Sequence, residues 1–235
     1  MQEQIGSILS AYDDLIEVNI NRISILEQLA EQIYKEWFVR MRFPGYLDVE
    51  FEKGIPKEWQ ITNYSVFEEF KKGKNITADT VIFGNVPVVA GGMEPAYYHN
   101  EANTKSPTIT ISASGASAGF VKLYFENIWA SDCSYLDTGN TNHIFYNYLH
   151  LKIRQSEIYF LQKGSAQPHV YPKDLMAMKI LLPNHDLIAK FEKLITPFFN
   201  EIKNLNQQIK ILKQTRDLLL PRLISGKLIV KHNME

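Results

Sequence analysis

This chain of 235 residues has almost no cysteine, which restricts the kind of protein it can be. Its single cysteine, Cys133, excludes an internal disulfide framework and suits a reducing compartment. The sequence has no run of about 18 apolar residues, and it does not begin with the basic-then-apolar pattern of a signal peptide. We therefore expect a soluble, cytoplasmic protein with no membrane segment.

Patterns typical of catalytic and metal sites are also missing. The six histidines show no metal-ligand spacing, and no second cysteine accompanies Cys133. The sequence contains neither the G-x-x-x-x-G-K-[ST] phosphate loop nor the G-x-S-x-G nucleophile turn. We expect no catalytic residue, no metal and no cofactor bound by this chain.

The stretch ITISASGASAGFV, residues 109–121, is the closest approach to a nucleotide-binding loop. Gly115 and Gly119 follow a β-like run, but the next residues, FVKLYFENIW, alternate as a strand does. A phosphate loop instead leads into a helix whose N–H groups meet the anion. We predict a glycine turn that joins two strands, although its backbone could still approach a polyanion.

The two ends of the chain carry opposite charge, although the whole chain has a net charge of −1. Residues 1–40 contain three basic and seven acidic side chains, net −4, and residues 185–235 contain nine and five, net +4. Apolar residues recur at heptad spacing in both segments, which predicts two long helices. The second stripe repeats the first, with Ile202 corresponding to Ile16 and Ile209 to Ile23.

A helix over residues 5–38 would be roughly 50 Å long at about 1.5 Å per residue, which is longer than a small globular core can cover. Each of the two helices therefore needs a partner helix. The opposite charges favour pairing of the two ends with each other. Asn19 falls within the first stripe, where a polar residue can fix the register, and Pro197 predicts a kink or a break in the second helix. The residues expected to form the helix pairing are Ile16, Ile23, Leu26, Ile202, Leu205, Ile209 and Leu212.

Residues 41–184, between the helices, are predicted to form a mixed α/β domain. Short β-like runs are separated by glycine, proline or asparagine, and the last run is MKILLPN. The stretch NHIFYNYLHLKIRQSEIYF is typical of a helix, and YSVFEEFKKGKNI predicts a short helix ending near Gly73. The expected fold class is therefore α+β, with one domain inserted between two long helices.

These patterns leave different functions open. The middle domain would be an enzyme if the glycine loop held a nucleotide, and such a domain would turn over a small molecule without a partner. The chain would be an adaptor if the paired helices were themselves the functional part, and partner binding would then be indifferent to nucleic acid.

Several longer stretches resemble the specificity subunits of type I restriction-modification systems. LLLPRLISGKL, residues 218–228, resembles the C-terminal signature of that family, and ILEQLAEQIYKEWF resembles its central conserved helix. GNVPVVAGG, PTITISASGASAGFVKLYFENIWASD and GSAQPHVYPKDLMAMKILLP resemble its target recognition domain. The match covers nearly the whole chain in the expected order. Full-length members have two recognition domains, so the resemblance implies a half-length form with one.

The resemblance also implies a mode of action. The two helices would pair as an antiparallel coiled coil, and the domain would read one half of a bipartite site on double-stranded DNA. A homodimer or a second specificity chain would read the other half. Methyltransferase subunits would bring S-adenosylmethionine and the catalytic residues, and a restriction subunit would complete the complex.

Loops are the expected places for DNA contact, since Gln and Asn can read base edges while Ser and Lys mostly position phosphates. The middle domain has a net charge of −1, from thirteen basic and fourteen acidic residues, so any basic patch must be local. The predicted DNA-contacting residues are Lys71, Lys72, Lys74, Tyr97, Tyr98, His99, Asn100, Ser112, Ser114, Ser117, Lys163, Ser165, Gln167 and His169.

Overall fold

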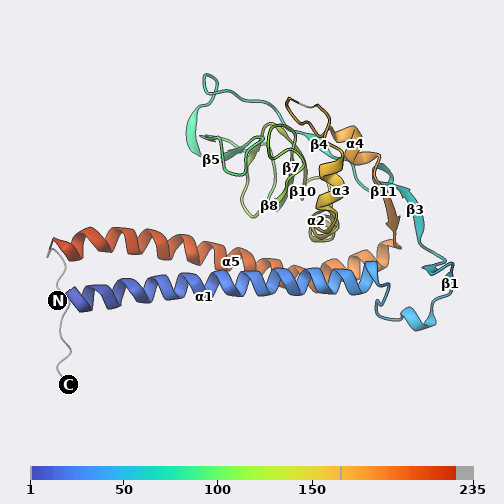
Figure 1. The fold of residues 1–235 in the computed structure, drawn as a ribbon, viewed down its shortest axis with the longest axis horizontal. Coiled ribbons are helices and arrows are strands. Elements are labelled where there is room, and N and C mark those ends of the chain that lie inside the picture. Colours follow the sequence, from blue (N-terminus) through green and yellow to red (C-terminus); the bar gives the residue numbers. More distant parts are fainter. Residues whose placement is uncertain (1, 165, 226–235) are drawn as a thin grey trace. The chain divides into compact units, whose positions relative to one another are not determined.

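The computed structural model describes residues 2–164 and 166–225, and the chain divides into two compact units. The helical unit combines Met1–Ala30 with Thr196–Glu235, and the α/β unit is Glu31–Ile195. Two long helices, α1 (Gln2–Tyr34) and α5 (His185–Ile224), contribute to both units (Figure 1). In the part of the chain described, no helix is long and apolar enough to cross a membrane.

In the helical unit, α1 and α5 lie side by side and run in opposite directions (Figure 1). Arg22 forms an ion pair with Glu201 at 2.8 Å, and Arg216 forms one with Asp13 at 2.6 Å. Residue 22 of α1 thus lies beside residue 201 of α5, and residue 13 lies beside residue 216. The residue numbers run in opposite directions, so the helices are antiparallel. The predicted antiparallel coiled coil is thus confirmed.

The predicted pairing residues occupy the covered side of these helices. Ile16, Ile202 and Leu205 are buried, and the other four are partly buried: Ile23, Leu26, Ile209 and Leu212. Asn19 is also buried, and its Nδ2 donates a hydrogen bond to Oε1 of Gln208 at 3.3 Å. A polar bond across an apolar seam is satisfied in one register only, which favours the observed alignment.

The helix α5 continues through Pro197, so of the two predicted outcomes, a kink or a break, the break is wrong. Proline lacks an N–H and therefore removes one hydrogen bond, but the flanking turns keep the helix intact. Pro221 lies inside the same helix. The final residues of the C-terminal signature, 226–228, lie outside the described residues.

The α/β unit is built on an antiparallel four-stranded sheet in the order β4-β10-β7-β8. Its strands are β4 (Lys71–Lys72), β10 (Cys133–Asp137), β7 (Thr108–Ser112) and β8 (Val121–Tyr124). Every residue of the two central strands is buried. Their β-branched and aromatic residues, TITIS and CSYLD, suit a strand that is covered on both faces.

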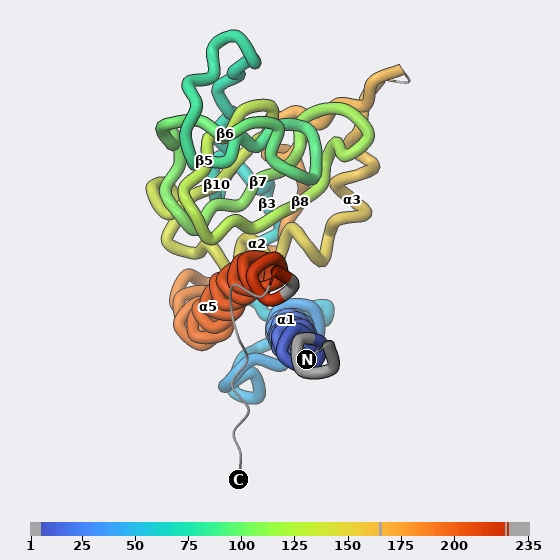
Figure 2. The backbone as a smooth tube through the Cα atoms, turned by 90° about the vertical axis from the view of Figure 1, so that its left-hand side faces the viewer, coloured from blue at the N-terminus to red at the C-terminus, as the bar shows by residue number. Residues whose placement is uncertain are grey.

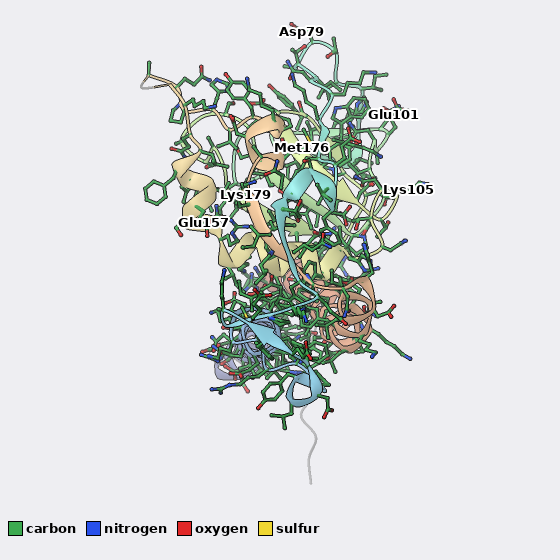
Figure 3. All side chains as sticks on the ribbon, turned by 90° about the vertical axis from the view of Figure 1, so that its right-hand side faces the viewer. Asp79, Glu101, Lys105, Glu157, Met176 and Lys179 are labelled. Atoms are coloured by element: carbon green, nitrogen blue, oxygen red, sulfur yellow. The ribbon has the colours of Figure 1, made fainter. Side chains whose placement is uncertain are left out.

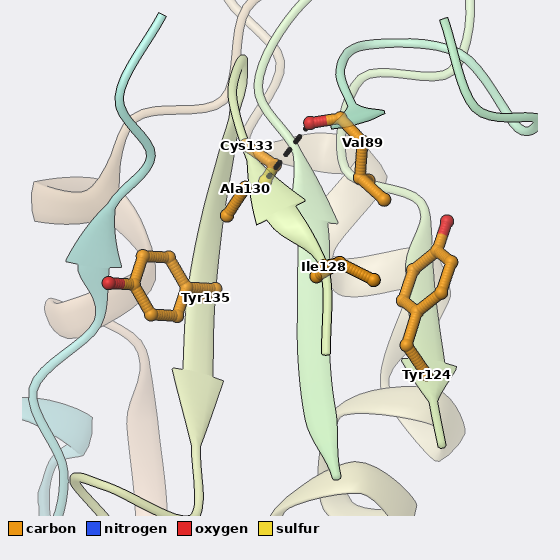
Figure 4. Packing of buried hydrophobic residues seen from close by; sticks show 6 residues of the cluster. All are labelled: Val89, Tyr124, Ile128, Ala130, Cys133 and Tyr135. Atoms are coloured by element: carbon orange, nitrogen blue, oxygen red, sulfur yellow. Dashed lines mark hydrogen bonds between the residues drawn. The ribbon is translucent and has the colours of Figure 1, made fainter. Parts of the chain in front are cut away.

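A three-stranded sheet adjoins the first, in the order β6-β5-β9. It contains β6 (Tyr97–His99), β5 (Phe83–Val89) and β9 (Trp129–Ala130), with β5 and β9 parallel. A cluster of buried apolar side chains links the sheets: Val89, Tyr124, Ile128, Ala130, Cys133 and Tyr135 (Figure 4). Burial raises the pKa of the Cys133 thiol to about 12, so this cysteine acts as a small core residue.

The remaining elements of the unit are short. Two two-stranded sheets pair β1 (Phe51–Glu52) with β2 (Ile55–Pro56) and β11 (Lys179–Leu182) with β3 (Gln60–Asn63). The predicted helix near residue 150 is confirmed as α2 (Ile144–Ile153) and α3 (Gln155–Phe160), and α4 (Pro172–Met176) follows. Single turns occur at Lys35–Val39, Tyr46–Asp48 and Tyr64–Val66.

The prediction of a short helix that ends near Gly73 is wrong. The chain makes one 3-10 turn at Tyr64–Val66 and then enters β4 as an edge strand. Tyr64 is buried, and its hydroxyl donates a hydrogen bond to Oδ1 of Asn147 at 2.5 Å. This anchor holds the turn in place, so tertiary contacts outweigh the local helical pattern.

Aromatic side chains near the ends of the two long helices pack into the α/β unit, Glu31–Ile195. Within this unit, the Phe38 ring lies 5.0 Å from the rings of Tyr146 and Phe191. Tyr34 lies 5.8 Å from Phe191. The last turn of α1 and the first turns of α5 therefore belong to the core of the domain.

Candidate nucleic-acid interface

One end of the four-stranded sheet gathers loops that are distant in sequence. The register places Ser112, at the end of β7, opposite Cys133, at the start of β10. Ile111 pairs with Val121, at the start of β8, and Ser134 pairs with Lys72, at the end of β4. All four strands therefore begin or end together, and we refer to this edge as the loop end of the sheet.

The glycine loop 113–120 lies at the loop end and joins β7 to the antiparallel β8, as predicted for a strand-to-strand turn. Gly115 and Gly119 have φ values of +79° and +84°, which side chains other than glycine rarely adopt. The Gly119 N–H donates to the Ser112 carbonyl at 2.7 Å and closes the loop. Loop closure thus explains both glycines, without a bound nucleotide.

Two further loops contact this glycine loop. The Ser112 hydroxyl donates to the carbonyl of Gly91 at 2.8 Å, which brings in the loop after β5. The Gly115 N–H donates to the Pro168 carbonyl at 3.1 Å, which brings in the loop before α4. The structure thus brings three loops together, and two of them, the glycine loop and the loop before α4, contain predicted DNA-contacting residues.

A second group of predicted residues surrounds Trp129. The Trp129 Nε1 donates to the Lys74 carbonyl at 2.8 Å, and the Lys74 ammonium lies 5.7 Å from the centre of the indole ring. His99 is buried and meets the same indole edge-on at 4.8 Å. Lys74 therefore presents its charge at an aromatic surface, whereas His99 has a packing role.

The two groups border a shared segment, residues 130–134. The Lys74 N–H donates to the Ala130 carbonyl at 2.9 Å, and the Ala113 N–H donates to the Asp132 carbonyl at 3.1 Å. Asp132 also accepts a short hydrogen bond from the Ser114 hydroxyl. Asp132 is therefore bonded to the glycine loop through both its backbone and its side chain.

The predicted residues divide into those with internal partners and those without. Ser112, Ser114, His99 and Lys163 have side-chain partners within the chain; Lys163 pairs with Asp174 at 2.7 Å. His169 stacks on Tyr171 at 5.9 Å. Among the described residues, side chains without a hydrogen-bonding partner belong to Lys71, Lys72, Lys74, Tyr97, Tyr98, Asn100, Ser117, Gln167 and His169. Ser165 lies outside the described residues.

Sequence reasoning missed three residues that build this site. Trp129 and Asp132 link its two groups, and Gln155 supports the glycine loop, because its Nε2 donates to the Gly119 carbonyl at 2.7 Å. No motif marks these residues, since their partners lie far away in the sequence. Lys105, Glu101 and Asp79 lie on the side of the unit away from Glu157 of α3 (Figure 3).

Gly91→Ala is expected to disturb the loop end. A Cβ at this position would lie 2.6 Å from the Ser114 carbonyl oxygen, and that backbone cannot move without loosening the glycine loop. We expect a loss of roughly 1–3 kcal/mol in the free energy of unfolding, measured by urea denaturation. The matched control is Gly92→Ala, whose Cβ would meet nothing closer than 3.6 Å. Equal stability of the two variants would contradict the close packing.

The architecture defines a class of protein in which a mixed α/β domain is inserted between two helices of an antiparallel coiled coil. The family model of the type I restriction modification DNA specificity domain matches residues 56–214. This match spans more than half of the sequence, and the chain belongs to that family.

Two curated relatives come from Methanocaldococcus jannaschii. The MjaIX specificity subunit of a type I restriction enzyme is 28% identical over 98% of this chain and 59% of its own length. The MjaVIII specificity subunit is 24% identical over 73% of this chain and 43% of its own length. This chain therefore spans about half the length of these relatives.

A solved structure supports the fold. The S subunit of a type I restriction-modification system from M. genitalium superposes with a TM-score of 0.69 at 20% identity. The superposition covers 94% of this chain and 60% of the other. The same order of helix, domain and helix is therefore found in an experimental structure.

Proposed function

We propose that this chain is a non-catalytic DNA-recognition subunit of a type I restriction-modification complex and reads one half of a bipartite site. The observation that carries this proposal is the gathering of three loops at one end of a rigid sheet, in a member of the specificity family. Loops on a rigid scaffold suit sequence recognition, because they vary without disturbing the core.

The contribution of charge is local in this proposal. Lys71 and Lys72 are exposed on the edge strand β4, and Lys74 is exposed beside Trp129. Such lysines neutralise phosphates and give a salt-dependent affinity, while uncharged side chains read bases. Partner subunits would add further phosphate contacts to a chain whose own net charge is −1.

A second surface supports docking of methyltransferase subunits. Val18 and Ile25 of α1 are 52% and 63% exposed, and Leu15 and Leu29 extend the same row. The spacing 15, 18, 25 and 29 follows a heptad in which Arg22 fills the remaining position, so a second stripe, apolar at four of five positions, runs along α1 outside the seam. An apolar stripe of this kind fits a partner helix, and catalysis with S-adenosylmethionine would then reside in the partner.

The other half-site requires another recognition domain. A homodimer of this chain would read two identical half-sites and so favour a palindromic, interrupted target. A second specificity chain would instead give an asymmetric target. The restriction subunit would join through the methyltransferase core.

Methylation mapping of host DNA tests the proposed function directly. Methylated positions are sequenced in cells with and without this gene, in the presence of the methyltransferase subunit. We expect an interrupted sequence motif that is methylated only when the chain is present. Methylation without sequence preference, or a motif that persists without the chain, would reject the proposal.

Val18→Asp is expected to weaken assembly with the methyltransferase subunit by tenfold or more, since a charge on the stripe must be desolvated when a helix docks. The variant should keep the thermal stability of the wild type, because Val18 is half exposed in the free chain. Assembly is measured by analytical ultracentrifugation. Ile61→Asp, at a 69% exposed position in β3, is the control. Equal assembly by both variants would contradict docking on this stripe.

A further inference from the structure

Lys163 and His169 form an isolated β-bridge that closes a short loop, which we call the finger; its described residues are 163, 164 and 166–169. The Lys163 N–H donates to the His169 carbonyl at 2.9 Å, and the His169 N–H donates to the Lys163 carbonyl at 2.8 Å. This pair closes the base of the finger in the manner of an antiparallel strand pair. Gly164 has a φ of +95°, and a Cβ there would come within 2.7 Å of the Gln167 carbonyl oxygen. Glycine is thus required where the finger turns.

The base of the finger is fixed to the loop end of the sheet. The Pro168 carbonyl accepts from Gly115, and the Val170 N–H donates to the Ala113 carbonyl at 2.9 Å. The finger therefore receives its position from the glycine loop. Its described residues run outward from the body of the α/β unit, as the light-orange segment at the upper right of Figure 2 shows.

The described tip of the finger is exposed and carries no charge. Gly164 and Ala166 are small, and Gln167 is the only amide side chain there. Among the described residues, this amide has no hydrogen-bonding partner. Lys163, at the base, already pairs with Asp174 at 2.7 Å. Among the described residues of the finger, Gln167 therefore offers an exposed amide that is not bonded within the chain.

We propose that this finger enters the major groove and that Gln167 is a specificity-determining residue that reads an adenine. The proposal rests on the proposed function, because it requires that the domain binds DNA. The major groove is wide enough for an α-helix or a β-ribbon, so a narrow loop also fits, and the small side chains of Gly164 and Ala166 let the backbone approach the base edges. A glutamine amide can donate to N7 and accept from the N6 amino group of adenine, so it forms two hydrogen bonds with that base.

Three other predicted DNA-contacting residues are less suited than Gln167 to contact a base edge. Asn100 follows His99, which pairs with Val86 and Phe83 near the start of β5, whereas Gly91, which contacts the glycine loop, follows the end of β5. Tyr97 and Tyr98 lie within a sheet strand and not at a projecting tip. Gln167 combines exposure, projection and an unused amide.

The test uses the full chain co-expressed with the methyltransferase subunit of its host. The probe is a duplex DNA library of random sequence, from which bound molecules are selected and sequenced. Wild type, Gln167→Ala and Gln167→Glu are compared, with Gln60→Glu as the control on the exposed strand β3. Gln167→Ala should reduce the preference for adenine at one position by roughly tenfold, within the range that one bidentate pair provides.

Gln167→Glu should move the preference at that position from adenine to cytosine, because a carboxylate can only accept and the cytosine N4 amino group donates. A motif left unchanged by both variants would overturn the proposal, and so would a loss of affinity that is equal for all sequences. Gly164→Val provides a second variant, since the added side chain displaces Gln167 and should blur the same position alone. A wild type that selects no motif would instead reject the proposed function.

Discussion

Replacing Leu205 with Asp should separate α1 from α5 in the helical unit and lower its free energy of unfolding by at least ~3 kcal/mol. Leu205 is fully buried and lies on the face of α5 that carries Glu201 and Gln208. Those two side chains bond across the seam to Arg22 and Asn19. A carboxylate at position 205 would therefore be desolvated in the seam, between two cross-helix contacts that already occupy their partners.

Circular dichroism melting and sedimentation measure this loss. Ile211→Asp is the control, because Ile211 belongs to the same helix and is 61% exposed. The double variant Ile209→Asp with Leu212→Asp should disrupt pairing and partner assembly less per site than Leu205→Asp, since both residues are only partly buried. Equal melting temperatures for the Leu205→Asp and Ile211→Asp variants would contradict the burial of Leu205 between α1 and α5.

The long helices could be predicted because their pattern is local. Heptad spacing marks the covered side of both helices, and the opposite charges of the two ends indicate that the ends are partners. Arg22–Glu201 and Arg216–Asp13 are instances of this complementarity. The continuity at Pro197 could not be predicted, because it depends on the strength of the flanking turns and not on the proline itself.

The candidate site could be predicted only in part. Its loops were recognisable from glycine, serine and lysine composition, but composition does not say which side chains are already bonded. Ser114 and Asp132 meet across 18 residues, and Lys163 finds Asp174 across 11. Gln167 and Ser114 were thus equivalent candidates in the sequence. The structure separates a scaffold residue from an uncommitted one.

Between pH 4.5 and 6.5, the variants His150→Gln and Glu192→Gln should show stability slopes of opposite sign. His150 is buried in the α/β unit, and its Nδ1 lies 2.7 Å from the Tyr34 hydroxyl. Arg154 Nη1 lies 3.0 Å from its Nε2. Because arginine only donates, Nε2 must accept, so the neutral ring carries its proton on Nδ1. Burial, aided by Arg154, lowers the pKa of His150 to about 3.

Glu192 has the opposite electrostatic response. Its two carboxylate oxygens accept from the N–H groups of Phe145 and Tyr146, at 3.0 and 2.8 Å, and so cap the start of α2. Burial nevertheless raises the pKa of Glu192 to about 7, because it outweighs these two bonds, and Glu68 adds to the rise. Burial also raises the pKa of Glu68, which adds to the effect of Glu192. Burial lowers the pKa of His143, which adds to the effect of His150.

The signs follow from proton binding in the folded and unfolded states. The folded pKa of His150 lies below its ordinary value of 6.5, so its contribution to stability is lost as the pH falls from 6.5 towards 3. The folded pKa of Glu192 lies above its ordinary value of 4.5, so its contribution is lost as the pH rises from 4.5 towards 7. The two effects oppose each other between pH 4.5 and 6.5 and largely cancel in the wild type.

Each substitution leaves one of these effects uncompensated. In His150→Gln the unfolding free energy should fall as the pH rises, because Glu192 still titrates. In Glu192→Gln the unfolding free energy should rise as the pH rises, because His150 still titrates. The slopes should differ by about 2–3 kcal/mol per pH unit, since each group contributes up to about 1.4 kcal/mol per pH unit. Urea unfolding followed by tryptophan fluorescence reports this unit, which contains Trp37, Trp59 and Trp129. The double variant should return to a slope near that of the wild type, and parallel slopes for the two single variants would rule out this opposition of buried charges.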